Sequence, residues 1–241
     1  MNNLQKIRSM LSKAQSIVVL TGAGISADSG VPTFRGKDGL WRNFRAEELA
    51  TPDAFRRDPV LVWEWYNWRR KIISTKSPNA AHHALVEMER STRSFTLITQ
   101  NVDGLHVKAG SNNIIEIHGN IWKVRCTVCG NITENYDVPI DILPHCDKCS
   151  GLLRPHIVWF GESLNPDDIN RSMNSLQNCE VLLVIGTSGI VQPAASFASI
   201  AKNAGAYVVD INIEETPNSY IVDETIVGRA SEVVPMLFKN T

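Results

Sequence analysis

Four cysteines in two C-x-x-C pairs have the spacing of a zinc site. Cys126 and Cys129 form the first pair, and Cys146 and Cys149 form the second after sixteen intervening residues. Each pair can offer two thiolates to one tetrahedral ion, and this separation is typical of four-cysteine zinc sites. Because four thiolates leave no coordination position open, we expect one structural Zn²⁺ ion. The alternative, a redox role, would need only one of the two pairs.

A glycine-rich turn near the start of the chain has the residue types of a dinucleotide-binding loop. The apolar run 17–20 leads into GAGISA at 22–27, which fits the pattern Gly-x-Gly-x-x-Ala. Glycines let the backbone bend sharply and approach a pyrophosphate, whose charge is met by N–H groups at a helix start. The expected contacts are Gly22, Ala23, Gly24, Ser26 and Ala27. The same pattern also occurs in many tight strand-to-helix turns that bind no ligand.

The acidic residue with which dehydrogenases usually bind the nucleotide ribose is missing. That residue ends a second strand roughly 20 residues after the glycines. Glu47 and Glu48 lie at a suitable distance, but no convincing strand precedes them. The sequence therefore indicates a dinucleotide but disfavours hydride transfer.

Polar residues also follow several later strands that the sequence predicts. They are Gln100, Asn101 and Asp103 after 95–99, His118 after 114–117, Gly186, Thr187 and Ser188 after 179–185, and Asn212 after 206–211. Because the carboxyl ends of parallel strands share one edge of a sheet, we expect these residues to converge on one ligand site. The alternative is ordinary turn chemistry, since Asn, Asp and Gly are common turn formers.

His118 is the candidate general base among the six histidines of the chain. Its near-neutral pKa suits proton transfer. Gly119 and Asn120 follow it and give it an open turn on the ligand edge. A single histidine at a strand end is nevertheless more often structural.

Apolar strands alternate with helical patterns along the chain, which predicts an α/β fold. We expect a Rossmann-like parallel sheet with helices on both faces. The clearest helices are predicted at 2–15, 58–73 and about 80–90. The irregular segments 34–77 and 121–154 are predicted to form a small inserted domain, with a helical module and the zinc module. The larger domain would then comprise 1–33, 78–120 and 155–241.

Composition excludes several classes of partner. The chain has 241 residues, 43% of them hydrophobic, and a net charge of −1. This near-zero charge argues against direct binding to nucleic acid or to an anionic membrane. The first residues lack the apolar core of a secretory signal, and no apolar run approaches the ~20 residues of a membrane span. We expect a cytoplasmic protein that binds no membrane.

Two further features suggest contacts with a substrate. Tyr66 and Arg69 lie three residues apart in the predicted helix 58–73 and therefore share a face. An arginine in apolar, aromatic surroundings needs a partner, and a carboxylate on a ligand would serve. The segments 158–162 and 189–193 are expected to be extended and could accept a peptide as an added strand. Ordinary connecting strands explain these two segments equally well.

Taken together, these motifs resemble those of the sirtuin family of NAD-dependent protein deacylases. The resemblance runs from about Met10 to Val234 and includes GAGISADSGVPTFRG, TQNVDGLH, HGN at 118–120, both cysteine pairs, VWFGE and GTSG. It implies a Rossmann-like domain and a small zinc domain, with NAD and an acyl-lysine peptide bound in the cleft between them. NAD would be a co-substrate and the zinc ion structural.

The resemblance also implies which residues bind NAD. The segment 22–41, which ends at Trp41, would bind NAD, with Ala23, Phe34 and Arg35 near the reacting ribose. Gln100, Asn101 and Asp103 would surround the nicotinamide and its ribose. The adenosine half would be held by Gly186, Thr187, Ser188, Asn212 and Glu214, with Ala230 beside the adenine.

The chemistry implied by the resemblance transfers an acyl group to ADP-ribose. The acyl carbonyl oxygen attacks the ribose carbon that bears nicotinamide, and nicotinamide leaves. His118 then acts as general base on a ribose hydroxyl, which attacks the amidate carbon. His118 and Asn101 are the predicted catalytic residues, and the products are free lysine, nicotinamide and O-acyl-ADP-ribose.

A more specific resemblance concerns the acyl group. Tyr66 and Arg69 match the Tyr-x-x-Arg of sirtuins that remove succinyl and malonyl groups, and Ala46 matches the small residue of their acyl pocket. The peptide itself would contact Val158, Phe160 and Gly161. We therefore expect desuccinylation and demalonylation together with deacetylation.

Two rival functions remain at this point. Mono-ADP-ribosyl transfer would use the same NAD-cleaving site. A zinc-ribbon module that binds nucleic acid without catalysis is disfavoured by the near-zero net charge.

Overall fold

The computed structural model describes residues 3–32, 40–41 and 44–238, with a six-stranded parallel sheet at its centre. In spatial order the strands are β11 (Glu224–Val227), β10 (Tyr207–Asn212), β9 (Val181–Ile185), β1 (Ser16–Thr21), β4 (Ser94–Thr99) and β5 (Ile114–Glu116). Every neighbouring pair is parallel. The chain runs outward from β1 through β4 to β5 and then returns to β9 on the other side of β1. Open α/β sheets bind ligands at the carboxyl ends of the strands where the order reverses in this way.

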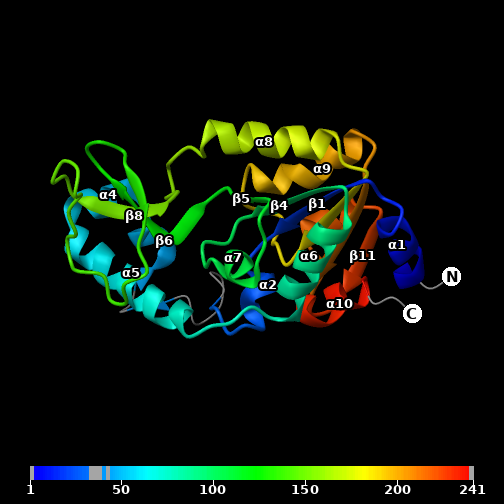
Figure 1. The fold of residues 1–241 in the computed structure, drawn as a ribbon, viewed down its shortest axis with the longest axis horizontal. Helices are drawn as coiled ribbons and strands as arrows, with labels where there is room; N and C mark the ends of the chain where they lie inside the picture. Colours follow the sequence, from blue (N-terminus) through cyan, green and yellow to red (C-terminus); the bar gives the residue numbers. More distant parts are fainter. Residues whose placement is uncertain (1–2, 33–39, 42–43, 239–241) are drawn as a thin grey trace.

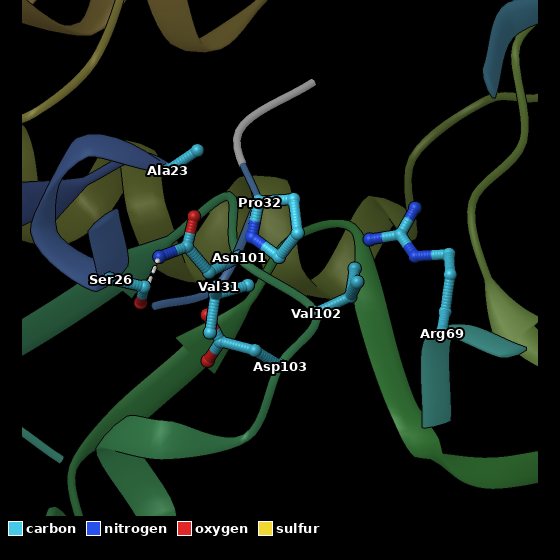
Figure 2. Close-up of a pocket in the computed structure, with 8 residues that line it drawn as sticks. All are labelled: Ala23, Ser26, Val31, Pro32, Arg69, Asn101, Val102 and Asp103. Atoms are coloured by element: carbon cyan, nitrogen blue, oxygen red, sulfur yellow. Dashed lines mark hydrogen bonds between the residues drawn. The ribbon is translucent and has the colours of Figure 1, made fainter. Parts of the chain in front are cut away.

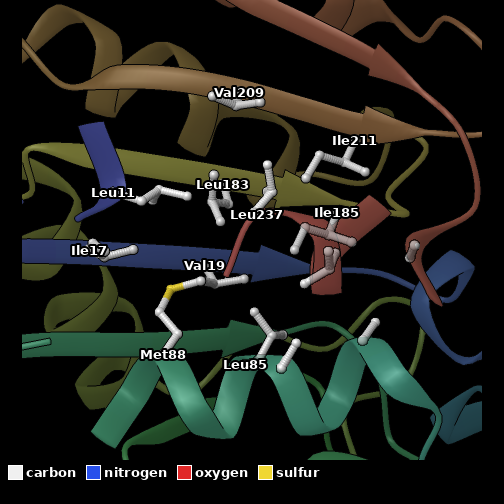
Figure 3. Packing of buried hydrophobic residues seen from close by; sticks show 14 of the residues in the cluster. Leu11, Ile17, Val19, Leu85, Met88, Leu183, Ile185, Val209, Ile211 and Leu237 are labelled. Carbon is white, nitrogen blue, oxygen red and sulfur yellow. The ribbon is translucent and has the colours of Figure 1, made fainter. Parts of the chain in front are cut away.

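The central strands are apolar on both faces because helices cover both sides of the sheet (Figure 1). Successive side chains of a strand point to opposite faces. Ile17 and Val19 thus join a core with α1 (Asn3–Leu11), α6 (Ala80–Ser91) and α10 (Ala230–Met236). Figure 3 shows part of this core. Val18 and Leu20 join the opposite core with α8 (Pro166–Gln177) and α9 (Phe197–Asn203).

A third core lies beside the sheet, in the part of the molecule that contains α4, α5, β6 (Gly119–Cys126) and β8 (Leu153–Ile157) (Figure 1). Helices α4 (Pro52–Arg57) and α5 (Pro59–Ser74) each begin with a proline after a capping side chain. Thr51 Oγ1 accepts a hydrogen bond from Ala54 N (3.1 Å), and Asp58 Oδ1 accepts one from Leu61 N (2.9 Å). Such caps satisfy N–H groups that have no partner within the helix.

Short elements complete the described chain. The antiparallel sheet of the third core comprises β7 (Ile132–Glu134), β6 (Gly119–Cys126) and β8 (Leu153–Ile157). The others are α2 (Gly24–Ala27), β2 (Leu40–Trp41), β3 (Phe44–Arg45), α3 (Ala46–Leu49), α7 (Leu105–Ala109), and the 3₁₀ helices η2 (Ala194–Ser196) and η3 (Pro217–Tyr220). None of the helices within the described ranges has the length and hydropathy to cross a membrane.

The predicted fold class is confirmed, while three local predictions are wrong. The helix predicted at 2–15 ends at Leu11. The segments 158–162 and 189–193 are irregular rather than extended strands. Gly161 and Gly189 have positive φ angles of 88° and 64°, a backbone conformation that interrupts a strand. The exact domain boundaries stay a prediction.

Candidate active site and metal centre

The glycine-rich loop after β1 packs directly against the loop after β9. Gly22 N donates to Ile185 O (3.0 Å), and Gly24 N donates to Gly186 O (2.8 Å). A methyl group on Gly24 would lie 2.7 Å from Gly186 Cα, which is closer than van der Waals contact allows. From the sequence, we expected these glycines for one reason, namely that they let the backbone approach a pyrophosphate. The contact between the two loops is a second reason why glycine is required.

A pocket opens beside the glycine loop at the carboxyl end of β4 (Figure 2). It is lined by Ala23, Ser26, Val31, Pro32, Arg69, Asn101, Val102 and Asp103. Asn101 Nδ2 donates to Gly22 O (3.1 Å) and to Ser26 Oγ (3.3 Å). These bonds tie the loop after β4 to the glycine loop. The pocket therefore brings together predicted residues from three segments that are far apart in the sequence.

Three lining residues were not named individually among the predicted contacts. Val31 and Pro32 lie between the predicted contacts at 22–27 and 34–35, and Val102 lies between Asn101 and Asp103. Only their position between predicted residues could have indicated that they line the pocket, because apolar side chains by themselves suggest packing rather than ligand binding.

Two polar side chains after β4 have the properties expected of ligand-binding groups. Asp103 is 5% exposed, burial raises the pKa of its carboxyl group, and its Oδ1 accepts a hydrogen bond from Leu105 N (2.8 Å). Gln100 Nε2 is buried and has no hydrogen-bond partner among the described residues. Because a buried donor without a partner is costly, an acceptor on a ligand would stabilise it. Both groups fit a nucleotide bound at this edge.

His118 is held in one tautomer by the backbone. Its Nδ1 lies 3.0 Å from Gln100 O. A carbonyl oxygen only accepts hydrogen bonds, so Nδ1 must carry the proton and Nε2 is left with a lone pair. Burial lowers the pKa of the imidazole, and the bond to Gln100 only partly offsets this effect. A neutral imidazole with a basic Nε2 is the form that a general base needs.

The residues predicted to hold the adenosine half lie around the ends of β9 and β10. Asn212 Nδ2 donates to Thr187 O (2.8 Å), which links the two strand ends. Ser188 is partly buried, Glu214 is exposed, and Ala230 lies buried at the start of α10. Phe34 and Arg35 lie outside the described residues, while Trp41 belongs to β2 and Ala46 begins α3.

Tyr66 and Arg69 of α5 lie in different surroundings. Tyr66 is 1% exposed, and its hydroxyl accepts a hydrogen bond from Trp159 Nε1 (2.8 Å). Arg69 is partly exposed, lines the pocket, and has its guanidinium carbon 5.1 Å from the centre of the Trp65 ring. Arg69 is thus the member of the pair that lines the pocket (Figure 2).

The arginine that is almost fully buried is Arg70 rather than Arg69. Arg70 is 1% exposed and donates to the backbone carbonyls of Ile121 (2.6 Å) and Asn135 (2.7 Å). The sequence argument that a buried arginine needs a partner therefore applies to Arg70, whose partners are backbone oxygens and the side-chain oxygen Asn135 Oδ1 (2.6 Å). These bonds fasten α5 to β6 and to the segment that follows β7.

The four cysteines of the two C-x-x-C pairs form one cluster. Their sulfur atoms all lie within 4.8 Å of one another, with Sγ–Sγ distances of 3.4 Å between Cys126 and Cys149 and 3.8 Å between Cys129 and Cys146. Four thiolates about 2.3 Å from a tetrahedral Zn²⁺ ion would be roughly 3.8 Å apart. The N–H groups of Cys129 and Val128 point at Cys126 Sγ and lower the pKa of that thiol to about 6. The cluster fits one structural zinc ion.

Comparison with known proteins decides the family. A sequence profile of the Sir2 family matches residues 22–193, which is more than half of the chain. The chain belongs to the Sir2 family. This sirtuin is 56% identical over 217 residues to the NAD-dependent protein deacylase of Aquifex aeolicus. The aligned region covers 90% of this chain and 91% of the relative. It is 49% identical over 237 residues to NAD-dependent protein deacylase 1 of Archaeoglobus fulgidus, covering 98% and 97% of the two chains.

Solved structures of Sir2 proteins have the same fold as this sirtuin. A crystal structure of a Sir2 homologue with NAD superposes with a TM-score of 0.92 at 49% identity, covering 97% of this chain and 91% of the other. A Sir2 variant with a deacetylated p53 peptide and 3′-O-acetyl ADP ribose superposes with a TM-score of 0.84 at 31% identity, covering 97% and 96%. The predicted enzyme class is confirmed: this sirtuin is an NAD-dependent protein deacylase, and NAD is its co-substrate.

Proposed function

We propose that this sirtuin removes succinyl and malonyl groups from lysine side chains in addition to acetyl groups. The observation that carries the proposal is that Arg69 lines the same pocket as Ala23, Asn101 and Asp103. A carboxylate at the end of an acyl chain could accept charge-assisted hydrogen bonds from this guanidinium, worth about 1.5–3 kcal/mol. An acetyl group has no such carboxylate, so its removal would not depend on Arg69.

The aromatic side chains of α5 support this role for Arg69. Trp65 lies against the guanidinium of Arg69, and this cation–π contact limits the positions that the long side chain can adopt. Trp65 in turn packs edge-on against Tyr66, with ring centres 4.6 Å apart. We expect Tyr66 to assist Arg69 by donating its hydroxyl proton to the acyl carboxylate, and Ala46 to leave room for the acyl chain.

We assign NAD to the edge of the sheet where the strand order reverses. The nicotinamide and its ribose would lie beside Ala23, Gln100, Asn101 and Asp103, where the buried Gln100 Nε2 can donate to a ligand oxygen. The adenosine half would lie toward Thr187 and the other predicted residues of that group. Bound NAD supplies the ADP-ribosyl group that accepts the acyl chain. The NAD contacts of Phe34, Arg35 and Trp41 stay predictions.

We assign the role of general base to His118, acting through Nε2 on a ribose hydroxyl. The hydrogen bond from Nδ1 to Gln100 O fixes the ring and supports this assignment. Asn101 would keep the glycine loop in place and so help to position the reacting ribose.

The peptide would lie along Val158, Phe160 and Gly161. Val158 N donates to His118 O (2.9 Å), which brings this segment next to the proposed base. Phe160 is 49% exposed and offers apolar surface that a bound peptide could cover. The bound p53 peptide in the related Sir2 structure also supports a peptide substrate.

The pH dependence of deacylation tests the role of His118. The base works only when it is neutral, and its pKa lies below the ordinary value of 6.5. Activity should therefore stay constant as the pH falls from about 8 to 6.5 and then drop, by about tenfold per pH unit, once the pH is below that pKa. The measurement is kcat/KM for an acetyl-lysine peptide at saturating NAD. A loss of activity that already begins above pH 7 would contradict the assignment.

The variant Arg69→Met tests the acyl specificity. We expect kcat/KM for a succinyl-lysine peptide to fall roughly 10- to 150-fold, which corresponds to the loss of 1.5–3 kcal/mol of interaction. The same variant should keep kcat/KM for the acetyl-lysine form of the peptide within about threefold, since no charge is involved. Both values are measured on one preparation with the same peptide sequence.

Arg69→Lys is the matched control for charge. Lysine keeps the positive charge but lacks the planar fork of arginine, so it should restore only part of the desuccinylation. Equal losses with the succinyl and acetyl peptides in Arg69→Met would refute the proposed role of Arg69.

A further inference from the structure

Trp159 lies between the proposed peptide-binding segment and the proposed acyl-binding helix. Its neighbours Val158 and Phe160 belong to the peptide segment, and its ring is 2% exposed. On the other side its indole Nε1 donates to Tyr66 Oη at 2.8 Å. The two partners are 93 positions apart in the sequence. Trp159 is therefore a direct link between the two halves of the proposed substrate site.

The direction of this hydrogen bond decides what the tyrosine can do. An indole N–H only donates, so the oxygen of Tyr66 must accept in this bond. The hydroxyl proton of Tyr66 is then directed away from Trp159. Burial raises the pKa of Tyr66 to about 12, so the hydroxyl keeps this proton at neutral pH.

Trp159 is itself held tightly. The Arg154 guanidinium carbon lies 3.3 Å from the centre of its ring, and the Phe55 ring centre lies 5.2 Å away. Its backbone N donates to Glu162 Oε2 (2.9 Å). Glu162 also accepts two hydrogen bonds from Arg154, at 2.5 and 2.9 Å. A tryptophan fixed by its ring and by its backbone can orient a partner precisely where a mobile side chain could not.

We propose that Trp159 is a positioning residue that determines acyl specificity. It fixes the Tyr66 hydroxyl as an acceptor toward the indole, and the hydroxyl thereby presents its own proton to the carboxylate of a succinyl or malonyl chain. This inference rests on the proposed function, because an acetyl group offers no carboxylate to that proton. Trp159 acts through Tyr66 and does not touch the acyl chain.

A double-mutant cycle tests the proposal, with Trp159→Phe, Tyr66→Phe and the double variant. Phenylalanine keeps an aromatic ring against Arg154 and Phe55 but has no N–H. For Trp159→Phe we expect the ratio of kcat/KM for succinyl over acetyl peptide to fall about three- to tenfold, the usual effect of one neutral hydrogen bond. Tyr66→Phe should lower the ratio at least as much. In the Tyr66→Phe background, Trp159→Phe should change the ratio no further.

The ratio is a safe readout because a loss of folded enzyme lowers both values equally. Additive effects of the two substitutions, or an unchanged ratio in Trp159→Phe, would overturn the inference. An unchanged ratio in Tyr66→Phe would also overturn the inference about Trp159. The variant Arg69→Met then shows whether the proposed acyl specificity fails with it. If Arg69→Met still lowers desuccinylation selectively, the proposed function stands and only the role of Trp159 fails.

Discussion

Replacing His118 with alanine should lower kcat for deacylation by roughly 10²- to 10⁴-fold, the range over which general bases contribute. The physical reason is that the neutral imidazole, with its proton on Nδ1 bonded to Gln100 O, leaves Nε2 as the one position that can take up a proton. Alanine removes this acceptor and leaves the ribose hydroxyl without a base. The measurement is the rate of free-lysine peptide formation at saturating NAD and acetyl peptide.

His83→Ala is the matched control for this experiment. His83 is exposed on α6 and is not among the residues that line the pocket, so its removal should leave kcat unchanged. Both variants should bind NAD with an affinity close to that of the original protein, since His118 is assigned to proton transfer. A His118→Ala enzyme that keeps more than a tenth of its activity would refute the assignment of the base.

Replacing Cys146 with serine should remove zinc and unfold the zinc module. The chain around the cysteines has little core of its own, because Val128, Ile132 and Ile142 are 74%, 49% and 44% exposed. Structural zinc contributes about 10–16 kcal/mol in small modules, which is as large as the total stability of many domains. The expected results are less than one zinc per chain by elemental analysis, a lower Tm, and rapid proteolysis between β7 and β8.

Cys179→Ala is the matched control for the zinc experiment. Cys179 is buried but lies outside the four-cysteine cluster, and burial raises the pKa of its thiol to about 11, so it is an unreactive core residue. This variant should keep one zinc ion per chain. A Cys146→Ser protein with full zinc content and unchanged Tm would show that the cluster does not hold a structural ion.

Features encoded by neighbouring residues could be predicted from the sequence. The cysteine spacing predicted the cluster because each C-x-x-C turn fixes two ligands locally. The polar residues after β4 and β9 could be placed at one edge because all strands of a parallel sheet end on the same side. The alternation of apolar strands with helical patterns along the chain indicated a parallel sheet with helices on both faces.

Contacts between distant segments could not be predicted in the same way. Nothing in the spacing of Tyr66 and Arg69 shows that the tyrosine is bonded to Trp159 while the arginine lines the pocket. No sequence pattern favoured Arg70 as the buried arginine, because its partners lie in distant segments and, apart from Asn135 Oδ1, are backbone oxygens. Backbone acceptors have no residue type, so no sequence pattern marks them.

The most direct test of the proposed acyl specificity is a product analysis of the unaltered protein. A succinyl-lysine peptide and its acetyl-lysine counterpart are each incubated with NAD, and the products are identified by mass spectrometry. We expect each of the two peptides to yield free-lysine peptide, nicotinamide and O-acyl-ADP-ribose, with the three products of one reaction formed in equal molar amounts. Product from the acetyl peptide with none from the succinyl peptide would contradict the role of Arg69 and the specificity built upon it.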